Sequence, residues 1–245
     1  MLKTAPRLCA WSGFFVFGDV LLRPHPPNPT MNRTLARVIS YLGHPLLVLT
    51  YVLLIMLAIN PYAFGAHWMG DERTVVLLLY VVSTTFLIPG LGVSLLRPLG
   101  LIKSLEMEDK MERTGAYIIT GIFYLWMIKN FMTGGVPLLY AKFVLGATIA
   151  LFFAFFANIF TKISIHTTGM GAMVMMLGLL AKTWPSKALT LGPCLMSLNV
   201  VLIVAVLWAG LVGSARRSLG AHRLPELWLG YAVGAVAVLL GYLVL

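Results

Sequence analysis

The stretch that decides the fold is Arg216-Arg217-Ser218-Leu219-Gly220-Ala221-His222-Arg223-Leu224-Pro225-Glu226, which separates two apolar runs at about 189–213 and 226–245. Each run is long enough to cross a bilayer as a helix, which takes about 20 residues. Arginine matches the oxygens of a phosphate, and histidine attacks or transfers protons near neutral pH. Glu226 follows His222 by one helical turn and is expected to orient its imidazole. The pattern predicts a polar site at the mouth of a membrane bundle.

The composition of the whole chain also indicates a membrane protein. Hydrophobic residues make up 60% of the 245 residues, and Asp, Glu, Lys and Arg only 11%, against about 25% charged residues in soluble domains. The net charge is +10, but the basic residues stand mostly at the ends of apolar runs, where lipid headgroups and topology explain them. We therefore expect no nucleic-acid partner. Cys9 and Cys194 are too few for a disulfide framework and lack the neighbours of a metal site.

Seven apolar runs predict an all-α fold, a polytopic transmembrane helix bundle of about seven spans within a range of six to eight. Their expected positions are 38–59, 74–96, 114–132, 138–160, 166–182, 189–213 and 226–245. Pro89 lies inside the second run and is expected to kink that helix. The connections are short, so residues 31–245 are predicted to form a single transmembrane domain. Residues 1–30 are expected to be a poorly ordered or signal-like leader, with Met31 as an alternative start.

Two further polar clusters stand at the starts of apolar runs. Ser164-Ile165-His166 opens the fifth run, and Lys110 and Arg113 precede the third. With seven spans, the starts of the third, fifth and seventh runs face the same side, so the three clusters are predicted to share one pocket. The carboxylates do not gather as a Mg²⁺ site would require, and we expect neither a metal ion nor a cofactor.

The spacing of the last cluster resembles S-R-x5-H-x3-D, a signature of the type 2 phosphatidic acid phosphatase superfamily of integral membrane lipid phosphatases. Arg216, His222 and Glu226 reproduce this spacing, with Ala215 in place of the serine and glutamate in place of the aspartate. Residues 163–166 resemble the family's P-S-G-H and keep only the serine and the histidine.

The first family motif, K-x6-R-P, is degenerate in this chain. Arg113 takes the place of its arginine, Glu106 stands where the lysine is expected, and Lys110 lies one turn before Arg113. The resemblance covers roughly residues 106–240, which we interpret as a phosphatase-like core.

The resemblance implies a two-step, metal-independent reaction. His222 would attack phosphorus to form a phosphohistidine, with Glu226 orienting it. His166 would act as general acid on the leaving oxygen and then help to activate water. The phosphate-binding residues implied by the resemblance are Arg216, Arg113 and Ser164. We add Lys110, which does not match the motif, because it lies one turn before Arg113 and would supply the missing cation.

The leading hypothesis is a phosphatase for a membrane lipid phosphate or an isoprenyl diphosphate, integral to a bacterial inner membrane. One alternative is a catalytically impaired relative that binds phospholipid headgroups. Another is a lipid transporter or scramblase, although the spans are nearly free of charge and only the second is interrupted. A small bias of basic residues favours the cytoplasmic face for the site, whereas a spanning leader at Leu8–Leu22 would invert this placement.

The same residues also allow purely structural interpretations, without any catalytic role. Taken alone, Arg216, Arg217 and Arg223 are typical of a topology signal, and His166 is typical of an interfacial residue. His44, which precedes Pro45 in the first span, is expected to hydrogen-bond a neighbouring helix. Gly230-x3-Gly234 favours close packing between helices.

Overall fold

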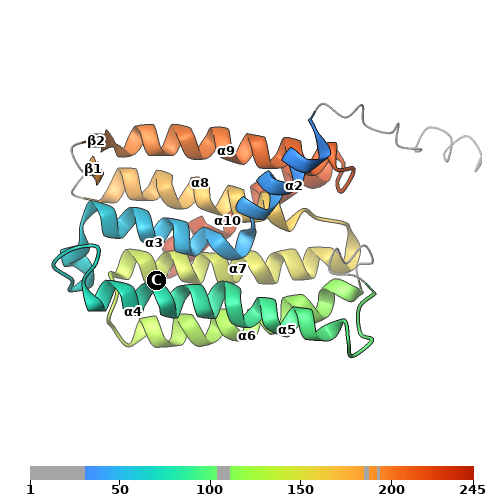
Figure 1. The fold of residues 1–245 in the computed structure, drawn as a ribbon, viewed down its shortest axis with the longest axis horizontal. Coiled ribbons are helices and arrows are strands. Elements are labelled where there is room, and N and C mark those ends of the chain that lie inside the picture. The colour runs from blue at the N-terminus through green and yellow to red at the C-terminus, as the bar shows by residue number, and fades with distance from the viewer. Residues whose placement is uncertain (1–30, 104–110, 185–187, 192–193) are drawn as a thin grey trace, which may run out of the picture.

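The computed structural model describes residues 31–103, 111–184, 188–191 and 194–245, and its long helices lie side by side in a bundle (Figure 1). The elements are α2 (Arg33–Leu42), η1 (Pro45–Leu47), α3 (Val48–Ile59), η2 (Pro61–Phe64), α4 (Glu72–Val82), η3 (Ser83–Leu87), α5 (Ile88–Leu96), α6 (Glu112–Met132), α7 (Leu138–Phe160), α8 (Ile165–Thr183), β1 (Ala188–Leu191), β2 (Cys194–Ser197), α9 (Leu198–Ser218) and α10 (Leu224–Val244). The predicted leader, residues 1–30, and Lys110 lie outside the described residues.

Most of the predicted spans correspond to helices long and apolar enough to cross a membrane. Among the described residues there are six such helices, at Arg33–Ile59, Glu72–Leu96, Leu138–Phe160, Ile165–Thr183, Leu198–Ser218 and Leu224–Val244. The predicted third span is helical as α6, but it carries Glu112, Arg113 and Lys129 and is not among the six. The nearly all-α membrane architecture is therefore confirmed, whereas the number of seven spans is not.

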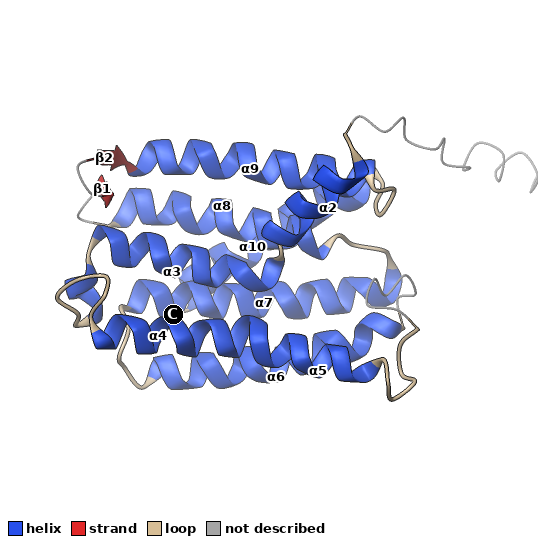
Figure 2. Cartoon of the chain, viewed as in Figure 1, coloured by secondary structure: helices blue, strands red, loops and turns tan. Residues whose placement is uncertain are grey.

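The predicted span at 189–213 is wrong at both ends. Residues 188–191 and 194–197 instead form the antiparallel strands β1 and β2, the one strand pair drawn in Figure 2. Helix α9 begins only at Leu198, where the Ser197 hydroxyl accepts a hydrogen bond from the Asn199 N–H at 3.3 Å. A short apolar run does not by itself distinguish a strand from a helix, which explains the error. Because α9 continues to Ser218, Arg216 lies on its last helical turn.

The second span is irregular next to Pro89, where a kink was predicted. The irregularity is one turn of π-helix, which is wider than an α-helical turn. The π-helical segment η3 joins α4 to α5 directly before Pro89. Proline has no N–H group, so Pro89 cannot donate the α-helical hydrogen bond to the carbonyl four residues before it. Thr85 donates its hydroxyl to the Val81 carbonyl at 2.8 Å, and Thr84 donates to the Tyr80 carbonyl. These local bonds allow the chain to remain helical through the irregular turn.

Helix α10 packs against α8 and α7, and its glycines set how closely it approaches α8 (Figure 2). A Cβ atom at Gly230 would lie 2.1 Å from the Thr167 hydroxyl, and one at Gly234 would lie 1.9 Å from the Thr168 carbonyl oxygen. Such distances leave no room for a side chain. The close packing predicted for Gly230-x3-Gly234 is thus confirmed, and it holds the first turns of α8 and α10 together.

We expect Gly234→Ala to destabilise the protein by about 1–3 kcal/mol or more, because its methyl group would force α10 away from α8. The measurement is thermal unfolding in detergent. Gly178→Ala is the matched control, since a Cβ atom at Gly178 has no neighbour within 4 Å. That substitution should be neutral or mildly stabilising, as alanine is favoured over glycine within a helix. Equal melting temperatures for the Gly234 variant and the wild type would contradict the close contact.

Candidate functional site

The predicted polar clusters lie at one end of the bundle, on the right in Figure 1. Helices α6, α8 and α10 begin at this end, and α9 finishes there. The segment 161–164 leads from the end of α7 to the start of α8, and residues 219–223 connect α9 to α10. Residues far apart in the sequence are therefore brought to one place.

The connection between α9 and α10 fixes the position of His222. Gly220 adopts a left-handed conformation with φ +68°, and its N–H donates to the Arg217 carbonyl at 2.9 Å, which ends α9. His222 then places Nδ1 2.8 Å from Oε2 of Glu226. The same Glu226 oxygen accepts the Arg223 N–H at 3.3 Å, at the start of α10. The orienting contact predicted between Glu226 and His222 is therefore present.

His222 is held in its neutral form. The pKa of His222 is lowered from 6.5 to about 4, chiefly by burial and also by the positive charges of Arg216 and Lys162, while the hydrogen bond and the charge of Glu226 act in the opposite direction. Only 5% of the His222 side chain is exposed. In a neutral ring whose Nδ1–H donates to a carboxylate, Nε2 keeps its lone pair. Near neutral pH this nitrogen has the electronic state that a nucleophile needs.

The start of α8 adjoins the same connection. The Ser164 N–H donates to the Glu226 carbonyl at 3.4 Å, which joins α8 directly to the first turn of α10. Ser164 is fully buried and precedes α8 as its N-cap, yet its hydroxyl makes no capping bond. Its carbonyl accepts the Thr168 hydroxyl at 3.0 Å. The first N–H groups of a helix lack helical partners and favour anions.

Three polar atoms of the predicted site are buried without a hydrogen-bond partner within the protein. These atoms are Oγ of Ser164, Nδ1 of His166 and Nε of Arg216. His166 lies close enough to Arg216 and His222 to interact electrostatically with both. Buried polar atoms are nearly always paired, so three in one cluster indicate a place suited to a polar ligand. An anion would satisfy the arginine and serine donors together.

The cations around this cluster also favour an anionic ligand. Arg113, on the first turn of α6, acts electrostatically on Arg216, and Lys162 acts on His222. Like charges that approach one another in a half-buried setting repel, and an anion between them would offset this repulsion. The structure therefore brings Arg113, Ser164, His166, Arg216, His222 and Glu226 together, whereas Lys110 lies outside the described residues.

His44 belongs to this neighbourhood, although it was interpreted from the sequence only as a structural histidine. Its ring lies edge-on to that of His166, with centroids 5.4 Å apart and an interplanar angle of 81°. Its Nδ1 accepts a hydrogen bond from its own segment, from the Leu46 N–H at 3.4 Å, where a bond to a neighbouring helix was expected. The signal that could have identified it is an ionisable residue within an apolar span.

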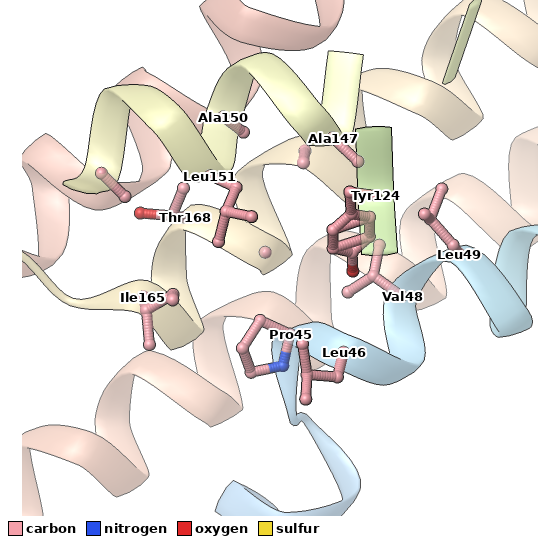
Figure 3. Close-up of a pocket in the computed structure, with 13 residues that line it drawn as sticks. Pro45, Leu46, Val48, Leu49, Tyr124, Ala147, Ala150, Leu151, Ile165 and Thr168 are labelled. Atoms are coloured by element: carbon pink, nitrogen blue, oxygen red, sulfur yellow. The ribbon is translucent and has the colours of Figure 1, made fainter. Parts of the chain in front are cut away.

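A narrow apolar pocket adjoins the cluster (Figure 3). Its volume is about 40 Å³, and it lies between the η1–α3 segment and helices α6, α7 and α8. Pro45 and Ile165, the sequence neighbours of His44 and His166, contribute to its wall. The other lining residues are Leu46, Val48, Leu49, Tyr124, Ala147, Ala150, Leu151, Ala154, Thr168, Gly169 and Ala172. The pocket wall thus includes the residues next to His44 and His166 in the sequence.

Comparisons of the chain with protein-family models, curated proteins and solved structures give no match. The resemblance to the lipid phosphatase superfamily thus stays a prediction from motif spacing. Within the described part of the chain, no group of three or more His, Cys, Asp or Glu residues is placed to hold a metal ion.

The lowered pKa of His222 predicts a pH dependence of stability. Between pH 6.5 and about 4 the folded protein binds fewer protons at His222 than the unfolded chain does, so stability falls as the pH falls through this window. The loss should reach at most about 3 kcal/mol. Melting temperatures in detergent, measured from pH 8 to pH 4, should fall more steeply for the wild type than for His222→Gln. Parallel curves would show that His222 is not held neutral.

Proposed function

We propose that the protein is an integral membrane phosphatase that hydrolyses a lipid phosphate or an isoprenyl diphosphate through a phosphohistidine intermediate. The observation that carries the proposal is the 2.8 Å contact between His222 and Glu226, beside the buried and unpartnered Arg216 Nε and His166 Nδ1. This arrangement combines an oriented nucleophile, a second imidazole and a phosphate-binding cation. Those are the groups that a metal-independent phosphoryl transfer needs.

In the first step, Nε2 of His222 attacks phosphorus and forms a P–N bond while the P–O bond to the lipid alcohol breaks. Glu226 stabilises the imidazolium that forms, because it already accepts from Nδ1. His166 acts in its protonated form and gives its proton to the leaving oxygen. The lipid alcohol leaves and the phosphoryl group stays on His222.

In the second step, His166 has lost its proton and takes one from water. The oxygen of that water attacks phosphorus, the P–N bond breaks, and inorganic phosphate is released with neutral His222. Arg216 and Arg113 offset the negative charge on the non-bridging oxygens in both steps. Ser164 Oγ and the first N–H groups of α8 supply neutral donors. Lys110 is proposed as an additional cation from its position in the sequence.

The apolar pocket supports a substrate with a hydrocarbon chain. Its wall begins at Pro45 and Ile165, so methylene groups next to the phosphate ester would enter it while the phosphate stays at the polar cluster. The pocket volume of about 40 Å³ is small for a lipid chain. It accommodates only the first part of a chain, and the remainder would extend between the helices into the bilayer.

We expect His222→Ala to reduce phosphate release from dioleoyl phosphatidate in detergent by at least about a thousandfold, because removal of a nucleophile ends covalent catalysis. Acid quenching of the wild type with ³²P-labelled substrate should trap a phosphorylated protein, and the variant should give none. Thermal unfolding would verify that the variant is folded. Undiminished phosphate release from His222→Ala would overturn the proposal.

Two adjacent arginines provide a matched comparison for the same assay. Arg216 is half-buried and has an unpartnered Nε, whereas Arg217 is exposed. Arg216→Gln should lower the rate by about a hundredfold to a thousandfold, and Arg217→Gln should leave it nearly unchanged. If the wild type binds phosphatidate without releasing phosphate, the headgroup-binding alternative is favoured. Movement of lipid between leaflets without hydrolysis would favour a transporter or scramblase.

We further propose that the protein resides in a bacterial inner membrane with its site at the cytoplasmic face. Arg33 and Arg37 lie on α2, at the start of the first span, and Arg97 and Lys103 follow the second span at the site end of the bundle. Basic residues near short spans favour the cytoplasmic side.

This orientation predicts the labelling of a single cysteine. We choose position 217, since Arg217 is exposed whereas the neighbouring Ser218 is buried. In an Arg217→Cys variant whose Cys9 and Cys194 are replaced by serine, a membrane-impermeant maleimide should react only after the cells are permeabilised. Reaction in intact cells would place the site on the outer face.

A further inference from the structure

We propose that His44 is a further phosphate-binding residue of this site and that its Nε2–H donates to the phosphate that His222 attacks. The inference rests on the proposed phosphatase function. It extends the site to the first span, outside the three clusters recognised from motif spacing.

The hydrogen bond to Nδ1 determines the tautomer of His44. The Leu46 N–H donates to Nδ1 at 3.4 Å, which requires a lone pair on that nitrogen. In the neutral ring the proton then resides on Nε2, which becomes a donor. Among the described residues, no hydrogen bond to Nε2 of His44 is found. A donor of fixed orientation is therefore left for a ligand.

Packing holds the His44 ring beside the His166 imidazole. A Cβ atom at Gly169 would lie 2.9 Å from Cα of Pro45, so the η1 segment rests directly on the second turn of α8. His44 consequently meets His166 with ring centroids 5.4 Å apart, and the charge of Arg216 acts on both rings. Phe86 lies edge-on at 6.3 Å and contributes an apolar contact.

A purely structural role does not account for an imidazole at this position. Capping η1 requires only an acceptor for the Leu46 N–H, and asparagine or serine serves this purpose well. The span Arg33–Ile59 is otherwise highly apolar in the part that follows His44. An ionisable side chain within such a span is costly, and such residues mark functional sites. Ligand binding by the unused Nε2–H, on a capped ring beside His166, is the role that we propose.

Two substitutions separate the cap from the donor. In His44→Asn, the amide oxygen can take the place of Nδ1 and keep the cap, but nothing replaces Nε2–H. In His44→Gln, the longer side chain can place an amide N–H where Nε2–H was, and the acceptor near Leu46 is lost. A structural role predicts harm from Gln and tolerance of Asn, whereas a phosphate-binding role predicts the reverse for ligand binding.

The measurement is the affinity for inorganic phosphate, obtained from the rise of the melting temperature in detergent with phosphate concentration. We expect His44→Asn to keep the melting temperature of the wild type without phosphate and to weaken phosphate binding by roughly tenfold to a hundredfold. We expect His44→Gln to melt at a lower temperature and to bind phosphate within about threefold of the wild type. KM for dioleoyl phosphatidate should follow the same order.

Unchanged phosphate affinity in His44→Asn would overturn the role of His44, while the proposed function would still stand on the His222 and Arg216 variants. A wild type that neither binds inorganic phosphate nor hydrolyses phosphatidate would instead overturn the proposed function, and the role of His44 with it. Weakened binding in both variants, without rescue by glutamine, would show that the packing of the ring matters and not its Nε2–H.

Discussion

The close approach of α10 to α8 is the contact on which the site depends. Water is absent from the interior of a bilayer, so helices there associate through tight packing, and small residues let two backbones meet. Gly230 lies against the Thr167 hydroxyl and Gly234 against the Thr168 carbonyl. The hydrogen bond from the Ser164 N–H to the Glu226 carbonyl closes the same interface at its polar end. A wider spacing would separate the imidazole on α8 from the one that precedes α10.

Packing alone does not explain why so many polar groups gather there. Arg216 and His166 each bury a nitrogen without a partner, and Arg113 acts on Arg216 at the margin of an apolar bundle. Such an arrangement costs stability unless another requirement maintains it. A bound anion is the simplest compensation, because a single phosphate accepts from several donors and carries the opposite charge. The polar cluster is thus understandable as a site whose donors are complete only with its ligand.

Part of this arrangement could be predicted from the sequence. The helical membrane class follows from apolar runs, and α7, α8 and α10 begin within two residues of the expected positions. The strand pair β1–β2 was missed because a short apolar run also suits a helix. Helix α9 runs further than expected because the apolar signal fades at residue 213, although Ser214, Ala215 and Arg216 continue the helix.

For the site too, contacts between residues close in the sequence could be predicted, whereas contacts between distant residues could not. His222 and Glu226 are four positions apart, so their contact is a local one, formed between the connection that precedes α10 and the first turn of that helix. Ser164 and His166 are also near one another in sequence, so their joint placement at a helix start could be predicted. His44 lies 122 positions before His166, and only the packing of η1 on α8 makes them neighbours. No spacing rule covers such a contact.

The charges that lower the pKa of His222 also connect its protonation to ligand binding. Burial keeps the imidazole neutral first, and Arg216 and Lys162 reinforce this. A phosphate anion beside these cations would offset their effect, while the carboxylate of Glu226 would continue to favour the imidazolium. In the proposed reaction, the free site would present a neutral nucleophile, and the occupied site would stabilise the positive charge that the nucleophile acquires. Burial, cations and a fixed carboxylate together suit His222 to both states.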